Sequence, residues 1–86
     1  MKREMIIESI RSFFETDLLK RSNVEHVSNT DNVISAGIVD SLGIVKIISY
    51  LEDTFSVAID DSDLVMENFE TIESMATFVE NCRDRQ

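Results

Sequence analysis

Hydrophobic residues recur at helical spacing along the first part of this 86-residue chain. Between about residues 3 and 20 they are three or four positions apart, which predicts an amphipathic helix. Its apolar side comprises Ile6, Ile7, Ile10, Phe13, Phe14 and Leu18. Lys20 suits the end of this helix, because a cation is favourable near the C-terminal pole of the helix dipole.

A second helix is predicted over about residues 41–55, where the polar and apolar positions separate at about 100° per residue. Its core stripe comprises Ile44, Ile47, Ile48, Leu51 and Phe55. Leu42 falls almost opposite that stripe, beside Lys46, Ser49 and Asp53, and Val45 falls at its edge. We therefore expect Leu42 and Val45 to form a small exposed apolar face.

The C-terminal third predicts a short helix over about 61–67 and a longer one over about 71–83. In the short helix we expect Leu64, alone or together with Val65, to be buried. Thr71 suits the N-cap of the last helix, and Glu73 in its first turn complements the dipole. The inner stripe of that helix comprises Ile72, Met75, Ala76, Val79 and Cys82.

The connection from Ser22 to Val39 has no sustained period. Unstructured loops of this length are uncommon in compact domains, so its scattered apolar residues predict that it packs across the helices. Gly37 is expected to supply a backbone turn before the second long helix. The fold class predicted for residues 1–86 is a single all-α domain, a four-helix bundle with a long first loop and a short third helix.

Acidic residues dominate the chain, whose formal net charge is -9. Between residues 22 and 82 there are twelve acidic residues and one basic residue, Lys46, a local charge of -11 (1 − 12). Nucleic acid and anionic membrane surfaces are therefore poor partners, and basic protein surfaces are good ones. No segment is apolar and long enough to predict a membrane span.

The residues that commonly carry catalysis or bind metals are sparse. His26 and Cys82 are single, so neither a metal site nor a catalytic triad for Ser41 is expected. A calcium loop starting at Asp61 would need glycine at its sixth position and glutamate at its twelfth, where Met66 and Ile72 stand. A single cysteine without a secretory signal predicts a cytoplasmic protein. Since Ser41 has no catalytic partners, we expect a substrate of enzymes and not an enzyme, and we expect a monomer.

The pair Asp40-Ser41 lies at the predicted start of the second long helix. Free backbone N–H groups and the positive end of the dipole favour an anion there, and a phosphate ester on a hydroxyl suits that place. The simpler interpretation is that Asp40 or Ser41 only caps the helix.

The run Gly37-Ile38-Val39-Asp40-Ser41-Leu42, then Val45, then Leu51 to Ile59, closely resembles the acyl carrier protein family, which includes peptidyl and aminoacyl carriers. The resemblance covers nearly the whole chain and is densest from about 34 to 79. It implies that Ser41 carries a covalent 4′-phosphopantetheine arm, taken from coenzyme A by a phosphopantetheinyl transferase with magnesium. The arm then holds acyl or aminoacyl groups as thioesters and presents them to loading enzymes, synthases and transferases.

The resemblance also implies which residues contact those enzymes. Asp40 would help to position the transferase's metal-bound cofactor, and Leu42 and Val45 would make apolar contacts. Glu52 and Asp53 would steer basic surfaces, and Lys46 and Ser49 belong to the same face.

Carriers of fatty acid synthesis usually have acidic residues where this chain has Gly43 and Lys46. This departure favours a free-standing carrier of a polyketide, nonribosomal peptide or dedicated lipid pathway over one of fatty acid synthesis. A D-alanyl carrier is related, but it typically has methionine at the position of Leu42. The competing interpretation is an unmodified acidic helical interaction module.

Overall fold

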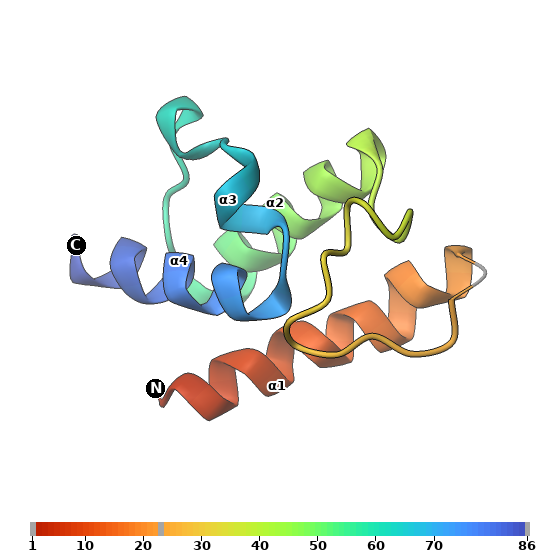
Figure 1. The fold of residues 1–86 in the computed structure, drawn as a ribbon. Helices are drawn as coiled ribbons and strands as arrows, with labels where there is room; N and C mark the ends of the chain where they lie inside the picture. Colours follow the sequence, from red (N-terminus) through yellow and green to blue (C-terminus); the bar gives the residue numbers. More distant parts are fainter. Residues whose placement is uncertain (1, 23, 86) are drawn as a thin grey trace.

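The computed structural model describes residues 2–22 and 24–85, and all regular secondary structure within them is helical (Figure 1). The long helices are α1 (Arg3–Phe13), α2 (Ser41–Phe55) and α4 (Ile72–Asp84), and α3 (Met66–Phe69) is a single short turn. The predicted fold class, an all-α bundle with a long first loop and a short third helix, is confirmed.

The first helical segment changes its hydrogen-bonding pattern along its length. After α1 the chain forms a π-helical turn, η1 (Phe14–Leu18), and then a 3₁₀ turn, η2 (Leu19–Arg21). Phe14 and Leu18 are both buried, so the π turn keeps the apolar side of the segment on the core. Single π turns inside α-helices occur frequently at functional sites.

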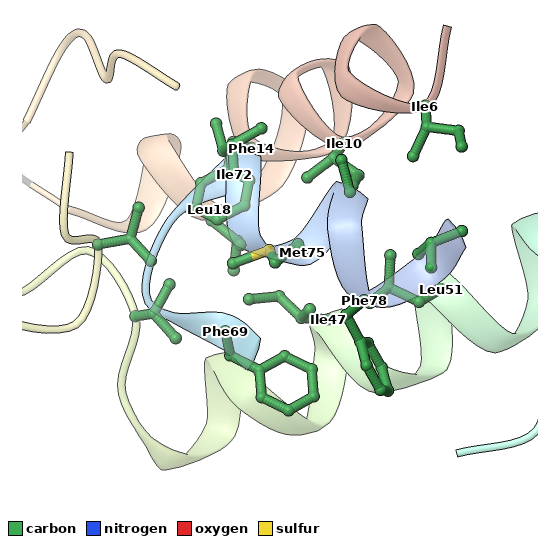
Figure 2. Packing of buried hydrophobic residues seen from close by; sticks show 14 of the residues in the cluster. Ile6, Ile10, Phe14, Leu18, Ile47, Leu51, Phe69, Ile72, Met75 and Phe78 are labelled. Carbon is green, nitrogen blue, oxygen red and sulfur yellow. The ribbon is translucent and has the colours of Figure 1, made fainter. Parts of the chain in front are cut away.

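One core joins the helices. Figure 2 shows labelled side chains from all four meeting between the ribbons: Ile6 and Ile10 of α1, Phe14 and Leu18 of η1, Ile47 and Leu51 of α2, Phe69 of α3, and Ile72, Met75 and Phe78 of α4. Phe69 and Phe78, which the sequence prediction left outside the core, pack edge to face with ring centroids 5.4 Å apart. Helix α1 packs directly against α4, and α3 against α4.

The long connection is held on both sides. Arg11 of α1 donates to the Val27 carbonyl at 2.8 Å, so the chain runs back along the first helix after η2. Further on, the Glu73 N–H donates to the Asn29 carbonyl at 3.0 Å, and the Val33 N–H donates to Glu70 at 2.8 Å. The connection thus crosses from α1 to the start of α4, as its scattered apolar residues predicted.

The third helical region differs from its prediction. A 3₁₀ turn, η3 (Asp61–Asp63), is separated from α3 by Leu64 and Val65, which are 47% and 44% exposed. The prediction that Leu64 or Val65 is buried is therefore wrong. The physical reason is that Val65 has an extended backbone (φ -116°, ψ 148°), so the two residues leave the helical face that would have turned them inward.

The start of α4 matches its prediction. Thr71 is the N-cap of α4, and its side chain accepts from the Ser74 N–H. In the linker after α2, Val57 is buried and Ile59 is half-buried. Within the described ranges, no helix is long and apolar enough to cross a membrane.

Candidate functional site

The entry into α2 is fixed by two buried residues. Ile38 and Val39 are 7% and 4% exposed, and both donate their N–H groups to the Val33 carbonyl, at 3.0 and 3.1 Å. Gly37 precedes them with a φ of 79°, in the left-handed region that glycine adopts without strain. The chain therefore emerges from the core at Asp40, leaving Asp40 and Ser41 exposed at the start of the helix.

Asp40 is the N-cap of α2. Its carboxylate accepts from the Gly43 N–H at 2.8 Å, and its carbonyl accepts from the Ile44 N–H at 2.9 Å. Of the two candidates for the cap, the structure thus assigns this role to Asp40. Ser41, the first residue of α2, is exposed, and within the described residues its hydroxyl has no hydrogen-bond partner.

This arrangement leaves an exposed nucleophilic hydroxyl beside unpaired donors. The N–H groups of Ser41 and Leu42 have no intrahelical acceptor, whereas that of Gly43 is satisfied by Asp40. The positive pole of the α2 dipole lies at the same place. A phosphate ester on Ser41 would be stabilised by both. An exposed Ser41 that does not cap the helix is therefore better suited to carry a phosphate-linked group than a buried, capping serine would be.

Two hollows lie at the start of α2, and Ser41 lines the larger of them. On the α3 side an apolar groove of about 480 Å³ is lined by Ile34, Val39, Asp40, Ser41, Ile44, Leu64, Val65, Met66 and Phe69. A smaller hollow of about 140 Å³ is lined by Leu18 of η1 and by residues around the start of α2, among them Leu42 and Lys46. A group attached to Ser41 thus has an apolar surface within reach, formed partly by the two residues that were expected to be buried.

The sequence-predicted partner face is mostly exposed. Leu42 and Val45 are 57% and 58% exposed, and Ser49 and Asp53 are exposed too. The structure therefore places four of the named residues on one accessible side of α2, the helix that begins at Ser41.

Lys46 and Glu52 are half-buried and already have partners. Lys46 pairs with Asp17 of η1, with Nζ 3.2 and 3.3 Å from the two carboxylate oxygens. The Glu52 carboxylate accepts from the Ile59 N–H at 3.2 Å, tying the linker after α2 to the helix. Asp17 was not singled out from the sequence, because a contact across 29 residues leaves no local signal.

Gly43 is a further residue of the site whose role the sequence did not reveal. A Cβ at this buried position would lie 3.2 Å from a Val39 methyl carbon and 3.4 Å from the capping oxygen of Asp40. Because Gly43 has no Cβ, the buried Val39 side chain and the capping carboxylate of Asp40 can lie close to the first turn of α2.

The other candidate groups lie away from Ser41. Cys82 is buried in α4, and burial raises the pKa of its thiol, although Arg85 donates to its sulfur at 3.1 Å. The same arginine lowers the pKa of Asp63 by a hydrogen bond and an ion pair. Across the part of the chain that the structure describes, no three His, Cys, Asp or Glu side chains gather to hold a metal ion.

The chain was compared with known proteins. The family model described as phosphopantetheine attachment site matches residues 9–79, a range that includes Ser41, all of α2 and α3, and parts of α1 and α4. No curated protein matches the chain.

Proposed function

The chain belongs to the phosphopantetheine attachment site family, and from this membership we propose that Ser41 is the attachment residue. The family match confirms the resemblance to acyl and peptidyl carriers, and with it the covalent 4′-phosphopantetheine cofactor. The protein is thus a phosphopantetheine-carrying carrier, and carrier domains of this kind are generally non-catalytic.

The observation that carries the assignment of Ser41 is its position as the first residue of α2. Its hydroxyl is exposed and, among the described residues, unpartnered, while Asp40 satisfies the cap. Attack by this hydroxyl oxygen on the phosphorus of coenzyme A next to the pantetheine forms the new ester. The pyrophosphate bond breaks, adenosine 3′,5′-bisphosphate leaves, and the serine proton passes to a base of the transferase or to water.

The chain's own residues hold and present the attached group. The thiol at the end of the arm supplies the chemistry, because it binds acyl or aminoacyl groups as thioesters. The α2 N-terminus would stabilise the phosphate, and Asp40, exposed beside Ser41, would help to position the metal-bound cofactor of the transferase. Leu42 and Val45 contact partner enzymes, and Ser49, Glu52 and Asp53 extend this face along the helix.

The partners we propose are a phosphopantetheinyl transferase and acyl- or aminoacyl-loading enzymes, synthases or transferases with basic docking surfaces. Such docking is small, transient and weakened by salt. Gly43 and Lys46 support service in a polyketide, nonribosomal peptide or dedicated lipid pathway. The reducing cytoplasm is the location that a single buried cysteine supports.

Intact mass spectrometry tests the attachment site. The wild-type chain is incubated with coenzyme A, magnesium and a broad-specificity phosphopantetheinyl transferase, beside Ser41→Ala and Ser62→Ala. Ser62 is the matched control, because it is an exposed serine in η3, outside the proposed site. We expect a single phosphopantetheine adduct on wild type and Ser62→Ala, and none on Ser41→Ala, with the same helical circular dichroism for all three.

Two results would contradict the proposal. An adduct on Ser41→Ala would place the attachment at another residue. The absence of any adduct on a folded wild-type chain, while a control carrier is modified in the same mixture, would favour the unmodified acidic interaction module.

A further inference from the structure

The segment that leads into α2 contains a compact turn over residues 32–37, which we call the Asn32 turn. The side-chain oxygen of Asn32 accepts from the N–H groups of Ile34 and Ser35, at 3.1 and 3.0 Å. The Asn32 carbonyl accepts from the Ala36 N–H at 3.0 Å. An asparagine side chain that bonds the backbone two and three residues ahead holds a turn locally. Asn32 thus fixes the shape of the turn from its first residue.

The turn directs the peptide groups of Val33 toward two other parts of the molecule. The Val33 carbonyl accepts from the N–H groups of Ile38 and Val39, at 3.0 and 3.1 Å, and so uses both of its lone pairs. The Val33 N–H donates to the carbonyl of Glu70, the C-cap of α3, at 2.8 Å. Val33 itself is fully buried. One residue therefore connects the entry into α2 with the end of α3.

These hydrogen bonds determine where the chain enters α2. Gly37 lies between the Asn32 turn and the helix, and glycine adopts many backbone conformations, so it does not fix the direction of the chain by itself. The bonds from Ile38 and Val39 to Val33 supply that direction. Because Ser41 follows Val39 by two residues, the position of its hydroxyl depends on these bonds.

The same connection relates Ser41 to α3. Ser41 and Phe69 of α3 both line the apolar groove, and Ile34 of the Asn32 turn lines it as well. The peptide groups of Val33 hold the start of α2 on one side and the end of α3 on the other. The Asn32 turn therefore sets where the serine lies relative to α3.

We propose that Asn32 is a positioning residue for the modification of Ser41. Through Val33 it holds the serine oxygen where this oxygen attacks the phosphorus of coenzyme A, as the new ester forms and adenosine 3′,5′-bisphosphate leaves. Asn32 itself does not touch the reacting atoms. The inference rests on the proposed function, because Ser41 has to be the nucleophile.

A positioning role has a kinetic signature that a purely structural role lacks. Misplacing a reacting group by about 1 Å can cost about 10²-fold in rate, even when the substitution is far from the chemistry. The exposed side chains of α2 that would contact the transferase are unchanged by a substitution in the Asn32 turn. Loss of the Asn32 side chain should therefore lower kcat and leave KM unchanged. A residue that only stabilised the fold would change neither constant of the folded chain.

Steady-state kinetics of a broad-specificity phosphopantetheinyl transferase test the proposal, with the carrier as the varied substrate. We expect Asn32→Ala to lower kcat about tenfold, within the loss that a misplaced nucleophile causes, with KM unchanged. Asn32→Asp keeps the side-chain acceptor and should restore most of the wild-type kcat. Asn81→Ala is the matched control, because it removes an exposed asparagine side chain of α4, and it should leave both constants unchanged.

Amide chemical shifts of the unmodified, ¹⁵N-labelled chain report the same connection without the transferase. The Ile38 and Val39 amide protons should move upfield in Asn32→Ala, because their hydrogen bonds to Val33 weaken. They should stay near their wild-type shifts in Asn32→Asp. Both amides are six or seven residues from Asn32, so the shifts report the turn and not the substituted side chain itself. If Asn32→Ala does not fold, Asn32→Gly also lacks the acceptor and gives the same two readouts.

Three results would overturn the proposal: a wild-type kcat for folded Asn32→Ala, unchanged Ile38 and Val39 shifts in that variant, or an equal loss of kcat in Asn32→Asp. An equal loss in Asn81→Ala would do the same. Failure of the proposed function has a different appearance, because no adduct would then form on wild type or on any variant. Equal rates of modification would instead leave Ser41 as the attachment residue and remove only the role of Asn32.

Discussion

Asp40 combines two roles that a substitution can separate. Its carboxylate caps α2 by accepting from the Gly43 N–H, and its negative charge lies directly beside the proposed attachment serine. Asparagine keeps a capping oxygen without the charge, whereas alanine removes both.

We therefore expect Asp40→Asn to leave the free energy of unfolding within about 0.5 kcal/mol of wild type, because asparagine caps as well as aspartate. Asp40→Ala should lose about 1 kcal/mol. Both variants should be modified by the transferase more slowly than wild type, since both lack the carboxylate. Urea denaturation measures the stability, and timed mass spectrometry measures the modification. Normal modification of Asp40→Asn would show that the charge has no part in the transfer.

Gly43 shows why a residue's role can be hidden in the sequence. Judged by helix propensity, a glycine in the first turn of α2 only costs stability, up to about 1 kcal/mol relative to alanine. In the structure its missing Cβ makes room for Val39 and the Asp40 cap. The helix propensity of Gly43 follows from its residue type alone. The close approach of Val39 depends on where that loop residue is buried, which the local sequence does not reveal.

At the scale of elements, the long helices could be predicted, whereas the short third helix could be predicted as a region but not in its bounds. The stripes of α1, α2 and α4 repeat over several turns, so their period is unambiguous. The region from Asp61 to Phe69 is too short to show a period, and its break at Leu64 and Val65 put two apolar residues on the surface of the groove. The π turn η1 lies inside the segment that was predicted as one continuous helix.

The candidate site follows the same division. Ser41, Asp40, Leu42 and Val45 could be found because they lie together in one local motif at a helix start. The pairing of Lys46 with Asp17 could not, since only the fold brings η1 beside α2.

This pairing gives a prediction for the two elements it joins. Lys46→Glu would place a second carboxylate next to Asp17, and we expect the free energy of unfolding to fall by no more than about 1 kcal/mol, as for a partly exposed ion pair. The double variant Asp17→Lys with Lys46→Glu should recover most of that loss. Thermal and urea unfolding of wild type, both single variants and the double variant give the coupling energy.

The same set of variants tests the role of Lys46 in partner choice. If its positive charge discriminates against enzymes of fatty acid synthesis, their loading rate should rise both in Lys46→Glu and in the double variant. The increase should shrink as salt is added, because it is electrostatic. A loading rate that is the same for all variants across a salt series would contradict this role.

At the scale of the whole molecule, the net negative charge opposes folding through self-repulsion, and it should favour docking to a basic partner surface. The net charge of -9 is confined to a molecule measuring 37 × 26 × 20 Å. The ion pairs Arg3–Glu80, Lys46–Asp17 and Arg85–Asp63 each join residues that are far apart in sequence. Each pair neutralises one carboxylate with one cation, but acidic residues outnumber basic residues by 17 to 8, so most carboxylates have no cation to pair with.

Salt should therefore stabilise the fold while it weakens partner binding. The Debye length is about 30 Å at 0.01 M ionic strength, comparable to the molecule, and about 4 Å at 0.5 M, shorter than most separations between its charges. Screening then removes more repulsion than attraction, because repulsive pairs outnumber the ion pairs. We expect the melting temperature to rise by several degrees between these conditions, since about 1 kcal/mol corresponds to 4–8 °C in a domain of this size.

Circular dichroism melts in sodium chloride measure this rise, and magnesium chloride at matched ionic strength is the control. Equal melting temperatures in the two salts identify screening as the cause, whereas a clearly higher value in magnesium would reveal a cation site on the acidic surface. Transferase modification, followed in the same sodium chloride series, should slow as the melting temperature rises, because screening also removes the attraction to a basic partner. A melting temperature that falls with salt would mean that the three ion pairs outweigh the net repulsion.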